Sequence, residues 1–147
     1  MYIDSLLLLS DAQAFSADAA STNTIDLGNV TPKRNFGDGE PMAMCISVDV
    51  AADATTGDET YEFQFIQSAN ADLTSPDILM ARAIARADLT LGSLHVVPIP
   101  PGAVTKRYIG GFFNGGGTTP TITATIWVTS QNMLQRYQSY AKGYTIS

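Results

Sequence analysis

The sequence has little charge, one cysteine, one histidine and no long hydrophobic run. Charged residues make up 15% of its 147 residues, against about 25% in an average soluble protein. Apolar residues make up 45%, which excludes a disordered acidic tail. A chain of this length forms one domain, residues 1–147, and buries a core without metal or disulfide staples.

The single cysteine, Cys45, excludes a disulfide scaffold. It lies between Met44 and Ile46, a position that predicts a buried small hydrophobe. We therefore expect a reducing compartment, or one in which redox state matters little.

Positive charge is scarce. Eight basic residues stand against 14 acidic ones, so the formal net charge is −6, and the longest basic runs are the pairs Lys33-Arg34 and Lys106-Arg107. Because a negatively charged chain repels a polyanion, we expect no nucleic-acid partner.

Long apolar segments are missing as well. The run Leu6-Leu7-Leu8-Leu9 has no basic segment before it and is flanked by Asp4 and Asp11. A secretory signal needs about 7–15 apolar residues, so this run does not predict a signal peptide. No segment approaches the roughly 18 apolar residues of a membrane span. We expect a soluble chain with no targeting signal and no membrane partner.

Groups that carry catalysis are few. His95 lies between Leu94 and Val96, which predicts a core or interface histidine with a backbone partner. Nothing near Cys45 favours a thiolate. The acidic residues Asp49, Asp53, Asp58 and Glu59 lack calcium-loop spacing and are interpreted as solvated loop acids. We expect no enzyme activity, no metal site and no cofactor.

Short segments with the features of strands alternate with turn residues, which predicts an all-β sandwich or barrel of about eight strands. Residues 76–87 are ambiguous between helix and strand, and the surrounding strands favour a strand. Glycines 115–117 predict a hairpin tip. The other expected strands are 21–27, 42–50, 61–67, 94–99, 107–113 and 119–129.

Trp127 alternates with threonines, on the face opposite Ile126 and Val128. An outward tryptophan marks a binding site or an interface. With Tyr61 or Tyr108 it would form a sugar-stacking platform. We favour the interface.

The C-terminal segment, residues 131–147, has no acidic residue and carries Tyr137, Tyr140 and Tyr144. It is interpreted as a contact arm, and the alternative is a last segment packed on its own sandwich.

Several short segments, taken in order, resemble the capsid cement (decoration) proteins of tailed bacteriophages, in particular the jelly-roll cement family of short-tailed phages. They span residues 1 to about 130. They are 7–15, 21–28, 39–41, 67–70, 73–76, 98–101 and 107–109.

The resemblance implies an antiparallel jelly-roll β-sandwich with extended terminal arms, residues 1–9 and 131–147. It implies a structural virion protein, made in the bacterial cytoplasm, that binds the outer capsid surface and bridges neighbouring major capsid proteins. A homodimer or homotrimer is expected, without cofactor or active site. The alternative function is a carbohydrate-binding jelly-roll module, for example of a phage fibre. The expected interface residues are Leu7, Leu9, Arg107, Tyr108, Trp127, Tyr137, Tyr140 and Tyr144.

Overall fold

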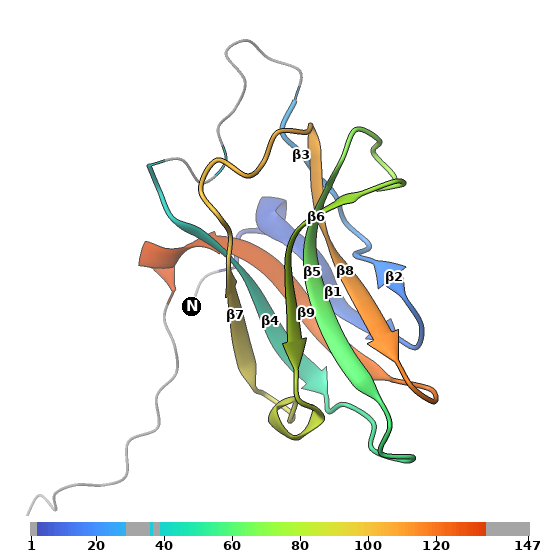
Figure 1. The fold of residues 1–147 in the computed structure, drawn as a ribbon. Coiled ribbons are helices and arrows are strands. Elements are labelled where there is room, and N and C mark those ends of the chain that lie inside the picture. Colours follow the sequence, from blue (N-terminus) through green and yellow to red (C-terminus); the bar gives the residue numbers. More distant parts are fainter. Residues whose placement is uncertain (1–2, 29–35, 37–38, 135–147) are drawn as a thin grey trace, which may run out of the picture.

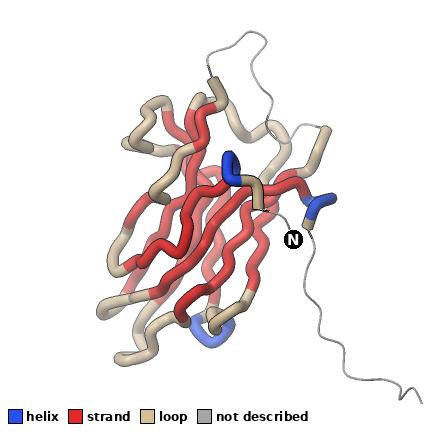
Figure 2. The backbone as a smooth tube through the Cα atoms, turned by 180° about the vertical axis from the view of Figure 1, so that it is seen from behind, coloured by secondary structure: helices blue, strands red, loops and turns tan. Residues whose placement is uncertain are grey.

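The computed structural model describes residues 3–28, 36 and 39–134 as two antiparallel sheets packed face to face (Figures 1 and 2). The strands are β1 (Leu8–Phe15), β2 (Ala19–Ala20), β3 (Ile25–Asp26), β4 (Met42–Val50), β5 (Thr60–Ser68), β6 (Asp77–Ile84), β7 (Leu94–Pro98), β8 (Tyr108–Gly116) and β9 (Ile122–Ser130). Three 3₁₀ turns accompany them, η1 (Ser5–Leu7), η2 (Arg86–Asp88) and η3 (Gln131–Met133). No helix among these residues is long and apolar enough to cross a membrane.

The strand order is that of a jelly roll. The first sheet runs β1-β9-β4-β7 and the second β2-β8-β5-β6, with the short β3 also paired to β8. Since β2 and β3 both pair with β8, they share one strand position, and each sheet has four positions. Apart from the β5–β6 hairpin, every connection between these strand positions crosses from one sheet to the other, which is the pattern of two Greek keys. The expected all-β jelly-roll sandwich is confirmed.

The apolar residues of β4 and β9 explain why these strands form the centre of the first sheet. Ile46 is paired with Ile126, and Met44 with Val128, on the face that points into the sandwich. Because strand side chains alternate between faces, the alternate apolar residues of β4 and β9 lie on one buried surface.

Aromatic rings fill the space between the sheets. Phe113 lies 5.1 Å from Phe15 and 5.4 Å from Phe63, measured between ring centroids, and Tyr61 packs beside it at 6.1 Å. All four side chains are fully or almost fully buried. Phe15 comes from the first sheet and the other three from the second, so this cluster joins the two layers.

The structure shows which of the ambiguous and terminal segments form strands. Residues 77–84 form strand β6, as favoured, but the expected strand 21–27 is reduced to β3. The expected arm 1–9 is only partly an arm, because β1 begins at Leu8 and Leu9 is buried in the core. Of the C-terminal arm, residues 135–147 lie outside the described part of the chain.

The prediction of a hairpin at glycines 115–117 is wrong. Strand β8 belongs to the second sheet and β9 to the first, so this loop crosses between the sheets. At Gly117 the φ angle is +82°, and an added Cβ atom would lie 2.3 Å from the carbonyl oxygen of Asp58. A glycine is therefore needed where this loop passes close to the loop that carries Asp58. The hydrophobic periodicity of a single strand does not reveal this contact.

Removing Phe63 from the aromatic cluster tests its role. We expect Phe63→Ala to lower the free energy of unfolding by about 3–5 kcal/mol, because it leaves a cavity between the sheets. Val50→Ala, at an exposed strand end, is the control and should cost less than about 1 kcal/mol. Denaturant unfolding followed by tryptophan fluorescence measures both; equal losses would contradict the assignment.

A pair of glycine variants tests the crossing loop. Gly117 and Gly28 both have φ near +80°, but only Gly117 has backbone against its missing Cβ. Gly28→Ala should cost about 1–2 kcal/mol from the left-handed backbone alone. Gly117→Ala should cost about 1–3 kcal/mol more, because the methyl group must displace the Asp58 carbonyl. Similar melting temperatures for the two variants would show that the crossing is not close-packed.

Candidate functional site

An apolar row crosses the outer face of the β1-β9-β4-β7 sheet. Its members, Leu8, Trp127, Cys45 and Val96, are register neighbours on the four successive strands, and we call them the outer row. Trp127, Cys45 and Val96 form a second buried cluster, separate from the sandwich core. These residues point away from that core, so the outer face of this sheet has a local apolar cluster among its threonines and serine.

Trp127 is only 2% exposed. Leu8, Leu94 and Leu134 pack against its cluster, and its indole Nε1 has no hydrogen-bond partner among the described residues. A sugar-stacking platform with Tyr61 does not form, since Tyr61 lies inside the sandwich with its hydroxyl donating to the Asp53 carbonyl at 2.9 Å. Trp127 lies on the face opposite Ile126 and Val128, as the alternation predicts, but its ring is buried and not exposed.

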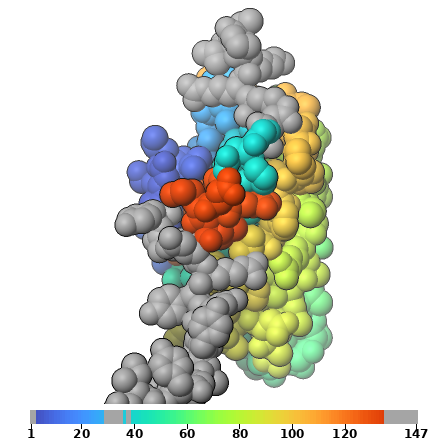
Figure 3. All heavy atoms as spheres, turned by 90° about the vertical axis from the view of Figure 1, so that its left-hand side faces the viewer, coloured from blue at the N-terminus to red at the C-terminus, as the bar shows by residue number. Residues whose placement is uncertain are grey.

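Exposed apolar side chains gather beside the outer row. Leu6 on η1 is 81% exposed and Met133 on η3 is 57% exposed, and Ile3, shortly before η1, is exposed as well. Turn η1 contacts β9, and η3 is the direct continuation of β9. Figures 2 and 3 show η1 and η3 near one another, on the side away from η2. We call Ile3, Leu6 and Met133 the end patch.

Arg107 and Tyr108 occupy the start of β8. The Arg107 guanidinium binds the Asp26 carboxylate through Nε at 2.7 Å and Nη2 at 2.9 Å, and its Cζ lies 5.0 Å from the centre of the Tyr108 ring. The ion pair is exposed, so it adds little stability. It does hold the guanidinium over the Tyr108 ring, within the range of a cation–π contact.

The structure therefore places the expected interface residues in different regions of the molecule. Leu9 belongs to the core, and Leu7 packs against that core from η1. Trp127 lies in the outer row and Arg107 with Tyr108 on the second sheet, so the structure does not bring them together. Tyr137, Tyr140 and Tyr144 lie outside the described residues.

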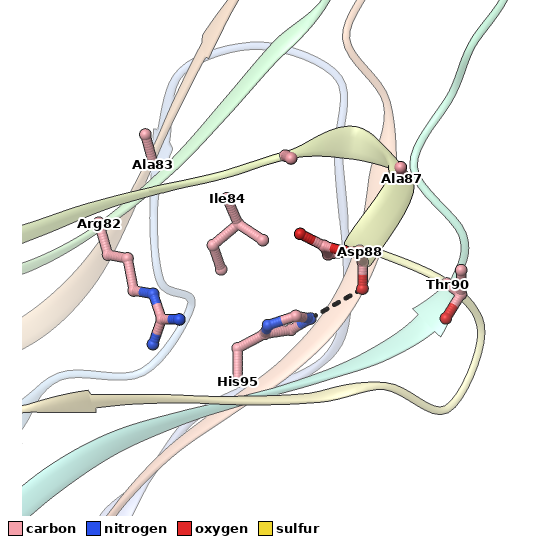
Figure 4. A pocket seen from close by; sticks show the side chains of 8 residues that line it. Arg82, Ala83, Ile84, Ala87, Asp88, Thr90 and His95 are labelled. Atoms are coloured by element: carbon pink, nitrogen blue, oxygen red, sulfur yellow. Dashed lines mark hydrogen bonds between the residues drawn. The ribbon is translucent and has the colours of Figure 1, made fainter.

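An open hollow of about 520 Å³ lies where the two sheets part, between the edge strands β6 and β7 (Figure 4). Arg82 comes from β6 and His95 from β7, while Asp88 and Thr90 come from η2 and the loop after it. Ile84 and three alanines supply the apolar part of the lining. We call it the β6–β7 hollow.

His95 confirms the prediction of a backbone partner. Its Nε2 lies 3.1 Å from the Asp88 carbonyl oxygen and 3.1 Å from Ser93 Oγ. Burial lowers the pKa of His95 below its ordinary value near 6.5, and the positive charge of Arg82 lowers it further, against the opposing effects of the Asp88 carbonyl and carboxylate. The imidazole is therefore held in its neutral form at pH 7.

The acidic loop residues accept hydrogen bonds within their own loop, and Asp58 also accepts from the backbone and hydroxyl of Thr118 on the loop between β8 and β9. Thr56 donates to Glu59 and Asp58, and these hydrogen bonds lower the pKa of both carboxyl groups; a hydrogen bond from Thr55 lowers the pKa of Asp53. Within the described ranges no group of three or more His, Cys, Asp or Glu side chains is arranged to hold a metal ion. The loop acids are thus explained by turn geometry.

Sequence reasoning missed the hollow and part of the end patch. Arg82 and His95 lie on consecutive strands, but only the assignment of these strands to the edges of two different sheets shows that both line one opening. The end patch had a signal in the leucine run at 6–9, but alternation alone did not show that Leu6 faces outward while Leu9 faces inward.

Residues 9–128 match the family model Bbp16. No curated protein matches the chain.

The lowered pKa of His95 predicts a pH dependence. Because the unfolded chain binds a proton near pH 6.5 and the folded chain only at lower pH, stability should fall as pH decreases from about 7 through the folded pKa. The loop carboxylates lose their contribution only below about pH 4. Unfolding measured between pH 7.5 and 5.5 should show this slope in the native chain and lack it in His95→Gln. A slope unchanged in that variant would contradict the assignment.

Proposed function

We propose that this chain, which belongs to the phage-related Bbp16 family, is a capsid cement protein. In this proposal it binds the outer surface of the phage capsid and bridges neighbouring major capsid proteins. Its location is the outside of the virion, and its partners are the major capsid protein and further copies of itself, as a homodimer or homotrimer.

The observation that carries the proposal is the end patch beside the outer row. Two large apolar side chains, Leu6 and Met133, stand exposed on the two turns that flank the first sheet. Exposed apolar groups that cluster mark protein-binding surfaces, and the centres of interfaces are poor in charge.

The low charge of the chain is also consistent with a role on the outer surface of the capsid. A net charge of −6 disfavours contact with packaged DNA and is compatible with the outside of a shell. A protein that binds assembled capsid subunits more tightly than free ones shifts the equilibrium toward the shell. Many copies with modest contacts produce a large total stabilisation.

The alternative, a carbohydrate-binding module, has less support. It required an exposed aromatic platform built on Trp127, and that ring is covered by leucines.

Charged substitutions in the end patch test the proposal. Leu6→Glu combined with Met133→Glu should weaken binding to undecorated phage shells by about tenfold or more, because two carboxylates would have to be desolvated in an apolar contact. Co-sedimentation of the purified protein with shells measures the affinity.

Leu91→Glu is the matched control. Leu91 is 72% exposed and follows η2, at the end of the sandwich away from the end patch (Figure 2). It should bind as the native chain does. Equal binding by all variants would exclude the end patch as the docking surface, and a native chain that fails to sediment with shells would overturn the cement function itself.

A further inference from the structure

Arg82 has a different environment from the two neighbouring basic residues of the second sheet. Lys106 pairs with Asp77 at 2.7 Å and Arg107 with Asp26 at 2.7 Å. Arg82 forms no salt bridge with any described residue, although acidic residues outnumber basic ones in the chain. Its positive charge faces the β6–β7 hollow without a bonded carboxylate, as Figure 4 shows.

The guanidinium is positioned by one hydrogen bond and keeps its other donors. Arg82 Nη1 donates to the Val96 carbonyl at 2.6 Å, which anchors the side chain of a β6 residue to strand β7. A guanidinium has five N–H groups in a planar fork that matches a carboxylate. The remaining donors lie at the opening between the sheets.

The other side of the hollow is ordered by His95. The Asp88 carbonyl can only accept a hydrogen bond, so the Nε2 of His95 carries the proton in that contact. The imidazole is thereby fixed in orientation between η2 and Arg82. Thr90 adds a hydroxyl, and Ala83, Ala85 and Ala87 add a small apolar wall.

We propose that the β6–β7 hollow binds a carboxylate group carried by an acidic segment of a partner polypeptide. The carboxylate pairs with the free donors of Arg82, and its aliphatic stem packs on Ile84 and the alanines. An acidic side chain fits a hollow of about 520 Å³ that has one cation, one hydroxyl and an apolar wall. This proposal does not depend on the identity of the partner as a capsid protein.

Asp88 opposes this binding and sets its strength. Its carboxylate lines the same hollow, on the η2 side. Repulsion between the Asp88 carboxylate and the bound carboxylate weakens the binding of a single carboxylate to the hollow. The partner therefore has to place its carboxylate on the β6 side of the opening. Replacing Asp88 by asparagine should therefore tighten binding by about two- to fivefold.

The single histidine makes the test specific, because His95 is the only imidazole in the chain. The probe is sodium acetate, titrated into the full chain against sodium chloride at equal ionic strength, with the ring signals of His95 followed by NMR. A bound carboxylate near the ring should raise the pKa of His95 and shift its signals in a saturable way. Sodium phosphate in a parallel titration distinguishes a carboxylate site from a general anion site.

Three variants separate binding from folding. Arg82→Gln should abolish the saturable shift, whereas Arg86→Gln, which removes the same charge from a residue outside the lining, should retain it. Asp88→Asn should lower the acetate concentration at half-saturation. The backbone amide spectrum of each variant reports its fold. No saturable shift in the native chain, an equal shift in Arg82→Gln, or tighter binding of phosphate than of acetate would overturn the proposal.

Discussion

One cluster of aromatic rings joins the two sheets and fixes which face of each sheet is buried. Phe15 from the first sheet meets Phe63 and Phe113 from the second in the middle of the sandwich. Once these rings are inside, the alternation of strand side chains decides which residues face outward on every strand. Leu8, Trp127 and Cys45 are thereby brought into register on the outer face of the first sheet.

The jelly-roll order then decides where the sandwich opens. Strands β6 and β7 are edges of different sheets, and they lie next to each other in the chain as well as in space. The gap between two such edges leaves backbone groups in need of partners. Arg82 satisfies one of them by donating to the Val96 carbonyl, and in doing so it positions a cation at the opening. One side chain thus protects an edge and creates a site.

These features favour a protein whose function is to bind other macromolecules. The end patch on η1 and η3 and the Arg107–Tyr108 pair lie at the surface on different parts of the sandwich, where they would be available to other macromolecules, while the outer row lies largely buried beneath the chain's own side chains. A cement protein needs such a distribution, since it must touch more than one neighbour to bridge them. The β6–β7 hollow would add a point of charge recognition to contacts that are otherwise apolar.

Four features could be predicted from the sequence alone: the all-β class, the opposite faces of Trp127 and Ile126, the burial of Cys45 and the backbone partner of His95. Each follows from local alternation and side-chain chemistry. Only the tertiary structure decided that glycines 115–117 cross between sheets, that Leu9 is buried while Leu6 is exposed, and that Trp127 is covered. It alone brought Arg82 to His95. These outcomes depend on which strands become neighbours, and that pairing is governed by the packing of the whole core, which no local pattern encodes.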